Sequence, residues 1–533
     1  MVLRPTVGER VLLGALITLF IALSLLIDVP AEEDAFIYYR YAEHWARGMG
    51  LVFNHGEWVE GYSSALWMGA LALLARLGTD LPTGAPLLSI LCGAGTLLAT
   101  RFLARELGLG QRDRVLACTS VTLSFPFLFW SRSGLDTTCY ALLLTAFAAL
   151  YLGNQYPAAP TQSASARHQY LGGVLLLLIA LCRPEGVLLA LVVVVDRWWD
   201  HRDWTGLRRY LGPWALGYGL CMAVRYTVYG AFTPNTSVKF NPYNAGAGLS
   251  QTLSYLCYLG GIPLLLAGWT LWHREVPIGK RGALRFLAVT VLIVSVSFQI
   301  ASGGDYRPGF RFLLPTLPLV VTACWYVFSS LRGGLVDWVR GPLPSFFCLA
   351  LLLLPSLWSL GQNLAQPHGQ NWPTQWRDPL ADEQDYHATA ARWVLAHIPP
   401  GSTVAFGQMG KAPYYALVTG KNLTFIDTIG LLDTRLSHLL GLGHKVATFW
   451  HFWSTGNGFS KTYQRGREHI HSQVSDYLLR ERKPDFVIIE SAFLQNRSVQ
   501  TLLTDPDFLR SYVLQASVPS QDQPGFLVYA RTA

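Results

Sequence analysis

A run of three acids, "EED" at residues 32 to 34, follows the first hydrophobic segment and begins the stretch "EEDAFIYYRYAEHWARG". Successive helical residues are turned by about 100°, so these like-charged side chains cannot share one face. We therefore expect at least one of them to point into an outer cavity. Partly apolar surroundings there would raise the pKa of a carboxylate and let it act as a general base. The alternative is that the acids cap the following helix, because negative charge favours its dipole.

Two later segments combine positive charge with small polar residues. They read "YGAFTPNTSVKF" (229 to 240) and "ASGGDYRPGFRFLLP" (301 to 315), and they contain Asn235, Lys239, Asp305, Arg307 and Arg311. Cations beside a membrane ordinarily extend towards lipid headgroups. In the topology predicted below, however, these cations lie on the outer side, against the usual excess of positive charge inside. We therefore expect a bound anion, and a lipid phosphate at the interface is the obvious candidate.

The segment "VEGYSS" leads into the second hydrophobic run and carries Glu60 and Tyr62. Both residues should lie at the same membrane depth as Asp34. Tyr62 also fits an aromatic belt at the membrane interface, which is the simpler interpretation for that residue alone.

Charged residues also interrupt apolar runs further along the chain. In "LCRPEGVLL" (181 to 189), Arg183 and Glu185 stand inside an apolar stretch, where an arginine is costly unless it is paired or functional. Local pairing across a kink at Pro184 and a place on the substrate path both remain open. We expect Asp136, in "SRSGLDTTCY", to cap a helix.

Composition indicates a membrane protein with a soluble part attached. The chain of 533 residues is 51% hydrophobic and only 14% charged, and its mean hydropathy is +0.29, which is too apolar for a soluble protein. Apolar runs of about 20 residues, the length that crosses a bilayer, recur up to about residue 360. We predict about eleven spans, near 11 to 29, 63 to 79, 83 to 101, 114 to 130, 138 to 153, 170 to 196, 209 to 229, 251 to 271, 285 to 302, 311 to 330 and 345 to 361.

The net charge of +8 follows from short basic loops between spans. Basic clusters at 197 to 210, 272 to 285 and 331 to 341 predict cytoplasmic loops, a cytoplasmic N-terminus and a C-terminal part outside the cytoplasm, so nucleic acid is not an expected partner. Residues 101 to 114 disagree with this topology, because they are basic but counting the predicted spans places them outside the cytoplasm. Either an early span is interfacial or "RPEG" splits a span.

We divide the chain into a polytopic domain (1 to 361) whose first outer loop is 30 to 62, a linker (362 to 379) and an α/β domain (380 to 533) on the outer face. In the last part, four short buried strands are expected at "TVAFG" (403 to 407), "LTFID" (423 to 427), "FVIIE" (486 to 490) and "FLVYA" (526 to 530). Helical spacing of apolar residues appears at 382 to 398 and 467 to 482.

No metal or disulfide chemistry is expected. The cysteines lie in or beside predicted spans, where cysteine is usually a small buried hydrophobe. The histidines are scattered and show no metal-ligand spacing.

Six segments carry a resemblance to a known family. They are "EEDAFIYYRYAEHWARGMGLVFNHGEWVEGYSSALW", "SGLDT", "RPEG", "YGAFTPNTSVK", "GGDYRPGFRFLLPTLP" and "FIDTIGLLD". In this order they resemble the GT-C membrane glycosyltransferases. The resemblance is greatest to the arabinofuranosyltransferases that include the terminal mycobacterial arabinan enzyme and the type IV pilin arabinosyltransferases. The acidic pair of that family is often Asp-Asp, whereas this chain has Glu33 and Asp34 preceded by Glu32.

The resemblance implies a polytopic α-helical GT-C fold and a glycosyltransferase of the inner membrane. Its donor would be a polyprenyl-phosphate-linked sugar, D-arabinofuranose in the family, and its acceptor a glycan or a glycoprotein such as pilin. Asp34, with Glu33, takes the catalytic position. The donor phosphate would be bound by Lys239, Arg307, Arg311 and Arg40. Sugar and acceptor contacts would come from Glu60, Tyr62, Asn235, Asp305 and Asp427.

No cofactor is expected, because a monophosphate leaving group needs less metal assistance than a diphosphate, although acids beside a phosphate can recruit a divalent cation. Tyr38 and Tyr41, on the helix that Asp34 begins, are further candidate donor or acceptor contacts, and Tyr414 is expected at the cavity. The rival interpretation is a flippase or transporter for the lipid carrier, which would not need an α/β domain on one side.

Overall fold

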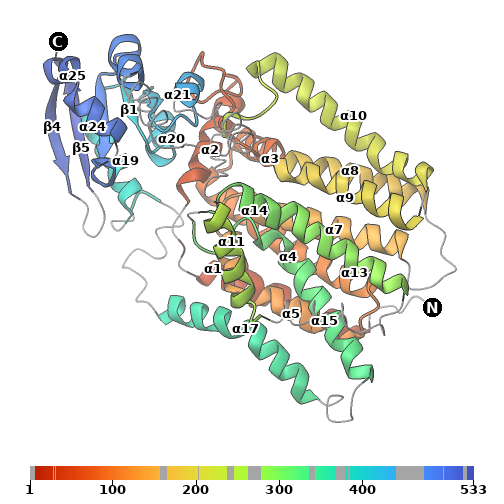
Figure 1. Ribbon diagram of the computed structural model, residues 1–533. Helices are drawn as coiled ribbons and strands as arrows, with labels where there is room; N and C mark the ends of the chain where they lie inside the picture. Colours follow the sequence, from red (N-terminus) through yellow and green to blue (C-terminus); the bar gives the residue numbers. More distant parts are fainter. Residues whose placement is uncertain are drawn as a thin grey trace, which may run out of the picture.

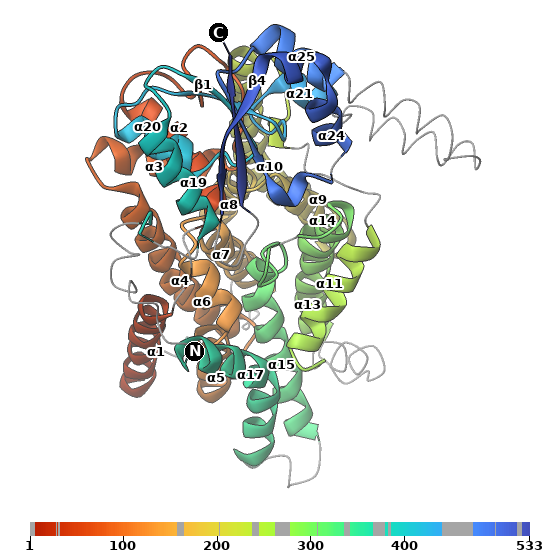
Figure 2. The same ribbon diagram turned by 90° about the vertical axis from the view of Figure 1, so that its left-hand side faces the viewer.

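A computed structural model describes most of the chain. The described residues are 6–27, 29, 32–156, 165–201, 203–236, 245–261, 278–305, 307–334, 342–365, 379–381, 385–439, 473–495, 497–519 and 525–532. They form a helical bundle that carries an α/β domain over one end, as Figure 2 shows. We call this end the domain-proximal end and the other the domain-distal end.

Hydrophobic runs form the bundle. Its α-helices are α1 (Val7–Leu26), α4 (Leu81–Glu106), α5 (Gln111–Thr122), α6 (Phe125–Ser131), α7 (Thr137–Gln155), α8 (Ala166–Cys182), α9 (Val187–Asp196), α10 (Trp204–Tyr229), α11 (Ala245–Tyr258), α13 (Ile278–Thr290), α14 (Ser297–Ala301), α15 (Leu317–Gly334) and α17 (Pro342–Ala365), arranged as in Figure 1. Among the described residues, five helical segments are long and apolar enough to cross a membrane, or six if α5 and α6, bent by 59°, count as one. In the part of the chain that the structure describes, length and composition thus account for five or six of the eleven predicted spans.

Two predicted spans differ from the structure. The run 63 to 79 contains only α3 (Ala65–Arg76), whose 12 residues extend about 18 Å, too short for a bilayer core of about 30 Å. This helix packs against α2 (Glu33–Ala46). The run 170 to 196 is broken, because α8 ends at Cys182 and a 3-10 turn at Pro184–Gly186 precedes α9.

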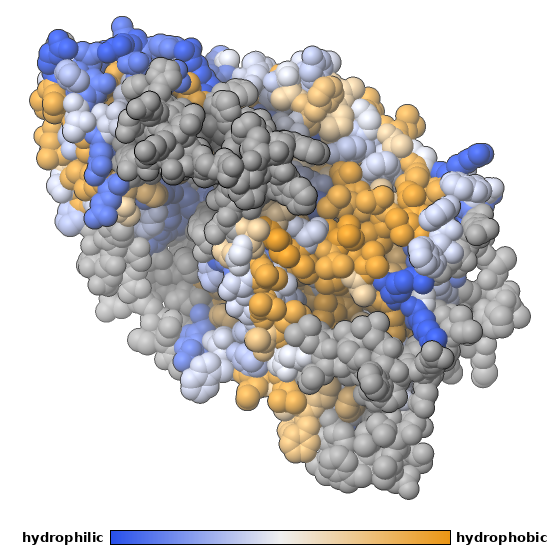
Figure 3. All heavy atoms as spheres, in the orientation of Figure 1, coloured by the Kyte–Doolittle hydropathy of each residue, from blue (hydrophilic) through white to orange (hydrophobic). Residues whose placement is uncertain are grey.

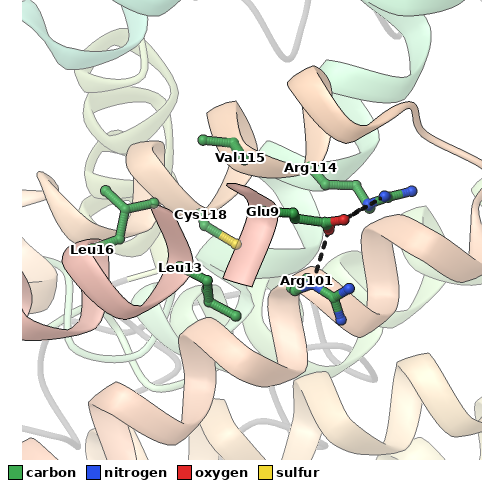
Figure 4. A pocket seen from close by; sticks show the side chains of 7 residues that line it. All are labelled: Glu9, Leu13, Leu16, Arg101, Arg114, Val115 and Cys118. Atoms are coloured by element: carbon green, nitrogen blue, oxygen red, sulfur yellow. Dashed lines mark hydrogen bonds and ion pairs between the residues drawn. The ribbon is translucent and has the colours of Figure 1, made fainter. Parts of the chain in front are cut away.

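The α4–α5 connection lies at the domain-distal end. Glu9, in the first turn of α1, forms ion pairs with Arg101 of α4 and Arg114 of α5, both at 2.9 Å, in the pocket of Figure 4. Lys280 of α13 donates a hydrogen bond to the Glu106 carbonyl at 2.8 Å. The basic residues 101 to 114 thus lie at the same end of the bundle as the start of α1, as a count that leaves out the short helix α3 expects.

The C-terminal domain contains a mixed five-stranded sheet in the order β2-β1-β3-β5-β4. Its strands are β1 (Thr403–Phe406), β2 (Thr424–Asp427), β3 (Phe486–Glu490), β4 (Tyr512–Val518) and β5 (Phe526–Arg531). Strands β2, β1 and β3 are parallel, whereas β5 is antiparallel to both β3 and β4. Four strands coincide with the predicted segments. β4 was not predicted, because this largely exposed edge strand has no buried apolar run.

The helices of this domain are α19 (Tyr386–His397), α20 (Lys411–Val418), α21 (Thr434–Leu439), α24 (Arg497–Thr504) and α25 (Pro506–Ser511). The described part of the predicted helix 467 to 482 is helical from residue 473 and ends in the π-helical turn Tyr477–Arg482. Figure 3 shows hydrophilic residues along the upper rim of the lobe that contains α24, α25 and β4, with apolar residues beside them, and apolar residues over the helical bundle. α2 and α20 pack together, so the start of α2 is held between the two parts.

Candidate active site

Asp34 lies in the first turn of α2, facing the loop between α14 and α15. The Arg307 Nη2 and the Arg311 Nη1 each lie 3.5 Å from one carboxylate oxygen of Asp34. Arg307 Nη1 also lies 2.7 Å from Glu32 Oε2. The structure therefore brings together the residues that the sequence singled out as catalytic acid and phosphate-binding cations.

Asp305 holds Arg311 in place. Its two carboxylate oxygens accept hydrogen bonds from Arg311 Nε at 2.9 Å and Nη2 at 3.2 Å, and it also accepts from the Arg307 backbone N–H. The Arg311 guanidinium lies over the rings of Trp130 and Phe312. Predicted to contact sugar, Asp305 instead orients the arginine, because both of its oxygens face that guanidinium.

The loop that carries the arginines is fixed from α6. Trp130 Nε1 donates a hydrogen bond to the Gly309 carbonyl at 3.1 Å. Gly309 has a φ of 79°, and a Cβ there would lie 2.8 Å from Trp130 Nε1. Only glycine fits this close approach without displacing the indole.

Arg183 lies behind the loop and forms its main ion pair with Asp136. Its Nη2 lies 3.0 Å from Asp136 Oδ1 and donates to Thr137 Oγ1 at 2.9 Å, while Glu185 is 3.7 Å from Nη1. Arg183 Nη1 also donates to the Arg311 carbonyl at 3.4 Å. Asp136 occupies the N-cap position of α7, as predicted, but its side chain makes no capping hydrogen bond to that helix. Its carboxylate balances the buried arginine instead.

The cluster opens partly to solvent at three side chains. Asp34, Arg307 and Arg311 are 18%, 17% and 11% exposed, whereas Glu32 and Asp305 are buried. Burial raises the pKa of Glu32, Arg307 opposes this shift, and the charge of Asp34 reinforces it. A ligand that reaches this cluster therefore meets Asp34 and the two guanidinium groups.

Glu33 points towards the C-terminal domain. Its carboxylate accepts hydrogen bonds from the backbone N–H groups of Gly410 at 2.7 Å and Lys411 at 3.1 Å, at the start of α20. These groups would otherwise be unsatisfied helix donors. The structure thus gives Glu33, predicted to be catalytic, a docking role, because its carboxylate is occupied away from the arginines.

Arg40 is also placed away from the cluster. Its guanidinium donates to the carbonyl oxygens of Phe53 at 2.8 Å, Leu423 at 3.2 Å and Pro413. Burial lowers the pKa of Arg40 to about 9. Six positions separate it from Asp34, which is about 9 Å along the helix axis. Arg40 therefore joins the C-terminal domain to α2, and the predicted phosphate contact does not fit its position.

The predicted sugar-binding residues Glu60, Tyr62 and Asn235 form a separate cluster at the end of α10. Glu60 pairs with Arg225 at 2.6 Å, and the Tyr62 hydroxyl lies 3.0 Å from that of Tyr229. The Asn235 side chain donates to the carbonyls of residues 430 and 431 at 2.9 and 2.8 Å. The contacts of Glu60 and Tyr62 join the loop after α2 to α10, and those of Asn235 join the end of α10 to the C-terminal domain.

Asp427 is buried at the end of β2. Its carboxylate accepts hydrogen bonds from the backbone N–H groups of Ile429 and Leu432, both at 2.8 Å. Burial raises its pKa to about 6, and these hydrogen bonds oppose the shift. Tyr414 is likewise buried, against the rings of Phe36 and Tyr39. Asp427 therefore lies inside the C-terminal domain and Tyr414 where α20 packs against α2, contrary to the expectation that they face the cavity.

Of the remaining predictions, Tyr38 and Tyr41 belong to α2 and are buried against the loop that follows this helix. The Tyr38 hydroxyl accepts from the N–H groups of Ser63 and Ser64, and the Tyr41 hydroxyl donates to the Val59 carbonyl. Lys239 lies outside the described residues. In the described part of the chain, no group of three or more histidine, cysteine, aspartate or glutamate side chains could hold a metal ion.

Comparisons with known proteins address the fold. Residues 374–529 match a family described as "Domain of unknown function (DUF8728)". No curated protein matches the sequence. The chain is similar to the crystal structure of ArnT from Cupriavidus metallidurans bound to undecaprenyl phosphate, with a TM-score of 0.57, 14% identity and 99% of both chains covered.

Two further solved structures are similar at lower scores. The archaeal oligosaccharyltransferase AglB from Archaeoglobus fulgidus, in complex with an inhibitory peptide and a dolichol-phosphate, has a TM-score of 0.51 and 9% identity, covering 99% of this chain and 75% of that one. The arabinofuranosyltransferase AftD from Mycobacteria has a TM-score of 0.47 and 15% identity, covering 98% and 42%. The last likeness is too low to support any choice of sugar. Together the first two confirm the predicted GT-C fold.

Proposed function

We propose that this chain is a membrane glycosyltransferase that moves a sugar from a polyprenyl-phosphate donor to a glycan or glycoprotein acceptor. The observation that carries the proposal is the partly exposed Asp34 carboxylate between the Arg307 and Arg311 guanidinium groups. A carboxylate beside two cations provides both of the groups that transfer from a sugar phosphate needs. The GT-C fold, shared with structures bound to undecaprenyl phosphate and dolichol-phosphate, supports it.

In the proposed reaction, an acceptor hydroxyl oxygen bonds to the anomeric carbon of the donor sugar while the bond from that carbon to the phosphate oxygen breaks. Asp34 takes the hydroxyl proton, and the electron pair of the broken bond leaves with the lipid phosphate. Arg307 and Arg311 hold the negative charge that develops there. No step needs a redox partner or a metal ion.

The long contacts of Asp34 with Arg307 and Arg311 favour its replacement by a phosphate at these two guanidinium groups. Charge-assisted hydrogen bonds are usually about 2.7 to 2.9 Å long, whereas both arginines lie 3.5 Å from Asp34. A phosphate oxygen approaching the guanidinium groups would therefore displace weak contacts. Asp305 keeps Arg311 oriented during this exchange because it binds the opposite edge of the guanidinium.

Orientation in the membrane follows from the basic segments. Residues 101 to 114 and Lys280 lie at the domain-distal end with the start of α1. Positive charge favours the cytoplasmic side. We therefore propose that the domain-distal end is cytoplasmic and that the C-terminal domain lies outside the inner membrane. For the sugar and the acceptor we propose D-arabinofuranose and a glycan or pilin-like glycoprotein, on the sequence resemblance alone.

The test is transfer by the purified full-length chain, reconstituted in lipid nanodiscs with radiolabelled decaprenyl-phosphoryl-D-arabinofuranose and an arabinofuranosyl trisaccharide as acceptor. Asp34→Asn should reduce transfer by 10²- to 10⁴-fold, the usual contribution of a general base, with unchanged thermal unfolding. The control is Asp476→Asn, which removes an exposed carboxylate paired with Arg480. Undiminished transfer by Asp34→Asn would exclude Asp34 from catalysis. Movement of the lipid phosphate across the bilayer without sugar transfer would favour the transporter interpretation.

A further inference from the structure

The carboxyl ends of three parallel strands meet at one edge of the C-terminal domain. β2, β1 and β3 are neighbours in this order, and the residues at their ends include Thr428, Gly407 and Glu490. In open α/β sheets, ligands bind outside the carboxyl ends of the strands. A Cβ at Gly407 would lie 3.4 Å from Thr428 Oγ1 and 3.6 Å from Glu490 Oε1, so these groups converge on a position that has no side chain.

Polar side chains converge at this edge. Gln408 Nε2 donates to Glu490 Oε1 at 2.7 Å and to the Tyr386 hydroxyl at 3.0 Å. The Tyr386 hydroxyl in turn donates to Glu490 Oε2 at 3.4 Å. Tyr386 contacts the His387 ring, with centroids 3.9 Å apart. We call Tyr386, His387, Gln408 and Glu490 the edge cluster.

The edge cluster reaches the acidic run at Glu33. His387 Nδ1 lies 3.9 Å from Glu33 Oε2, and this nitrogen is buried without a hydrogen-bond partner among the described residues. Glu33 is the chain neighbour of Asp34. Consecutive helical residues diverge by about 100°, so Glu33 faces the edge cluster while Asp34 faces Arg307.

Charge decides what the edge cluster can accept. Glu490 and Glu33 are both buried, and the charge of Lys411 is balanced by an ion pair with Asp385. A phosphate or carboxylate would meet like charge here. Hydroxyl groups, in contrast, can donate to the carboxylates and accept from the amide and the tyrosine. An uncharged carbohydrate matches these groups.

We propose that the edge cluster is the acceptor subsite and that it binds an uncharged carbohydrate through its hydroxyl groups. The acceptor then approaches Asp34 from the C-terminal domain, while the phosphate of the donor lies against the arginines. This assignment rests on the proposed transferase function for its role, but binding of the carbohydrate can be measured without turnover.

The experiment uses the full-length chain in nanodiscs and two probes, a neutral α-1,5-linked arabinofuranosyl trisaccharide and its phosphorylated analogue. Binding is followed by saturation-transfer difference NMR. The neutral probe should bind at least tenfold more tightly than the phosphorylated one. Glu490→Gln and Gln408→Leu should each weaken binding of the neutral probe about tenfold and leave binding of undecaprenyl phosphate unchanged.

The matched control is Glu481→Gln, an exposed carboxylate of the same domain that pairs with Arg435; binding of the neutral probe should be unaffected. In transfer assays, Glu490→Gln should raise the acceptor KM more than it lowers kcat. No binding of the neutral probe, or equal binding by wild type and both edge variants, would overturn the subsite. Binding that depends on the edge cluster in a chain that transfers no sugar would overturn the proposed function and leave the carbohydrate site standing.

Discussion

Two charge clusters lie at opposite ends of the helical bundle, and their geometry differs. At the domain-distal end, Glu9 binds Arg101 and Arg114 at 2.9 Å, and the three side chains are 2%, 9% and 8% exposed (Figure 4). At the domain-proximal end, Asp34 lies 3.5 Å from Arg307 and Arg311, and all three side chains reach solvent.

The difference separates a cluster that stabilises from one that can react. Both oxygens of Glu9 are used by the two guanidinium groups, so a further anion would have to displace a close buried carboxylate. In the Asp34 cluster the carboxylate contacts are long and accessible, and a phosphate can replace them at lower cost. Similar residue types therefore have different roles because their distances and exposure differ.

The largest expected effect is on stability, in Glu9→Gln. The change leaves two buried guanidinium groups without a counter-charge, and breaking such a pair costs about 3 to 5 kcal/mol. Thermal unfolding in detergent should shift strongly, while transfer per folded molecule stays at the wild-type value. Glu43→Gln, which removes an i,i+4 pair with Arg47, should cost less than about 1 kcal/mol. Loss of transfer without loss of stability would place the Glu9 cluster in the reaction.

Arg311→Gln should reduce transfer, whereas Glu9→Gln reduces stability. Transfer should fall about 10²- to 10³-fold, as when one donor to a developing negative charge is removed, which corresponds to about 3 to 4 kcal/mol. Because the substitution also leaves Asp305 without its partner, the double variant Arg311→Gln/Asp305→Asn separates the effects. It should regain stability but not transfer. Recovery of transfer in the double variant would mean that Arg311 only balances Asp305.

A smaller effect is expected for Glu33→Gln. The amide oxygen still accepts from the start of α20 but without its charge, so docking of the C-terminal domain should weaken by about 1 kcal/mol. Hydrogen exchange at Gly410 and Lys411 should become faster, and transfer should fall by about tenfold or less. A loss of transfer as large as that of Asp34→Asn would return Glu33 to the catalytic role predicted from sequence.

The smallest effect is a pH dependence at Glu32. Burial raises the native-state pKa of Glu32 above its ordinary 4.5, so the native state holds the proton more tightly than the unfolded chain. This contribution is present below pH 4.5 and is lost as the pH rises through the native-state pKa. The Tm of wild type should therefore fall relative to that of Glu32→Gln between pH 4.5 and 7. A difference that grows in favour of wild type would show that Arg307 outweighs burial.

Hydropathy predicted much of the bundle, and charge singled out some of the residues that the structure brings together. Runs of apolar residues located the helices, and cations expected on the outer side marked Arg307 and Arg311 as candidates for binding a phosphate, which the structure places beside Asp34. Hydropathy could not show that α3 fails to cross, because a short apolar helix lying beside α2 has the same composition as part of a span.

The predictions that failed concern residues whose partners are distant in the chain. Glu33 and Arg40 contact atoms more than 370 positions away, and their roles depend on how the C-terminal domain packs on α2. Gln408 and Glu490 were not proposed as site residues, because a single polar residue after a strand becomes informative only once the strand order is known. The parallel order of β2, β1 and β3 supplies that information.

The divergence of Glu33 and Asp34 on one helical turn has a consequence for inhibitor design. The two residues are consecutive, with Cα atoms about 3.8 Å apart, so their two carboxylates keep a fixed relation on one rigid helix. A single compound can therefore be designed that joins a phosphate mimic for Arg307 and Arg311 to a neutral sugar for the edge cluster. Such a molecule would gain affinity because little flexibility is lost when both ends bind.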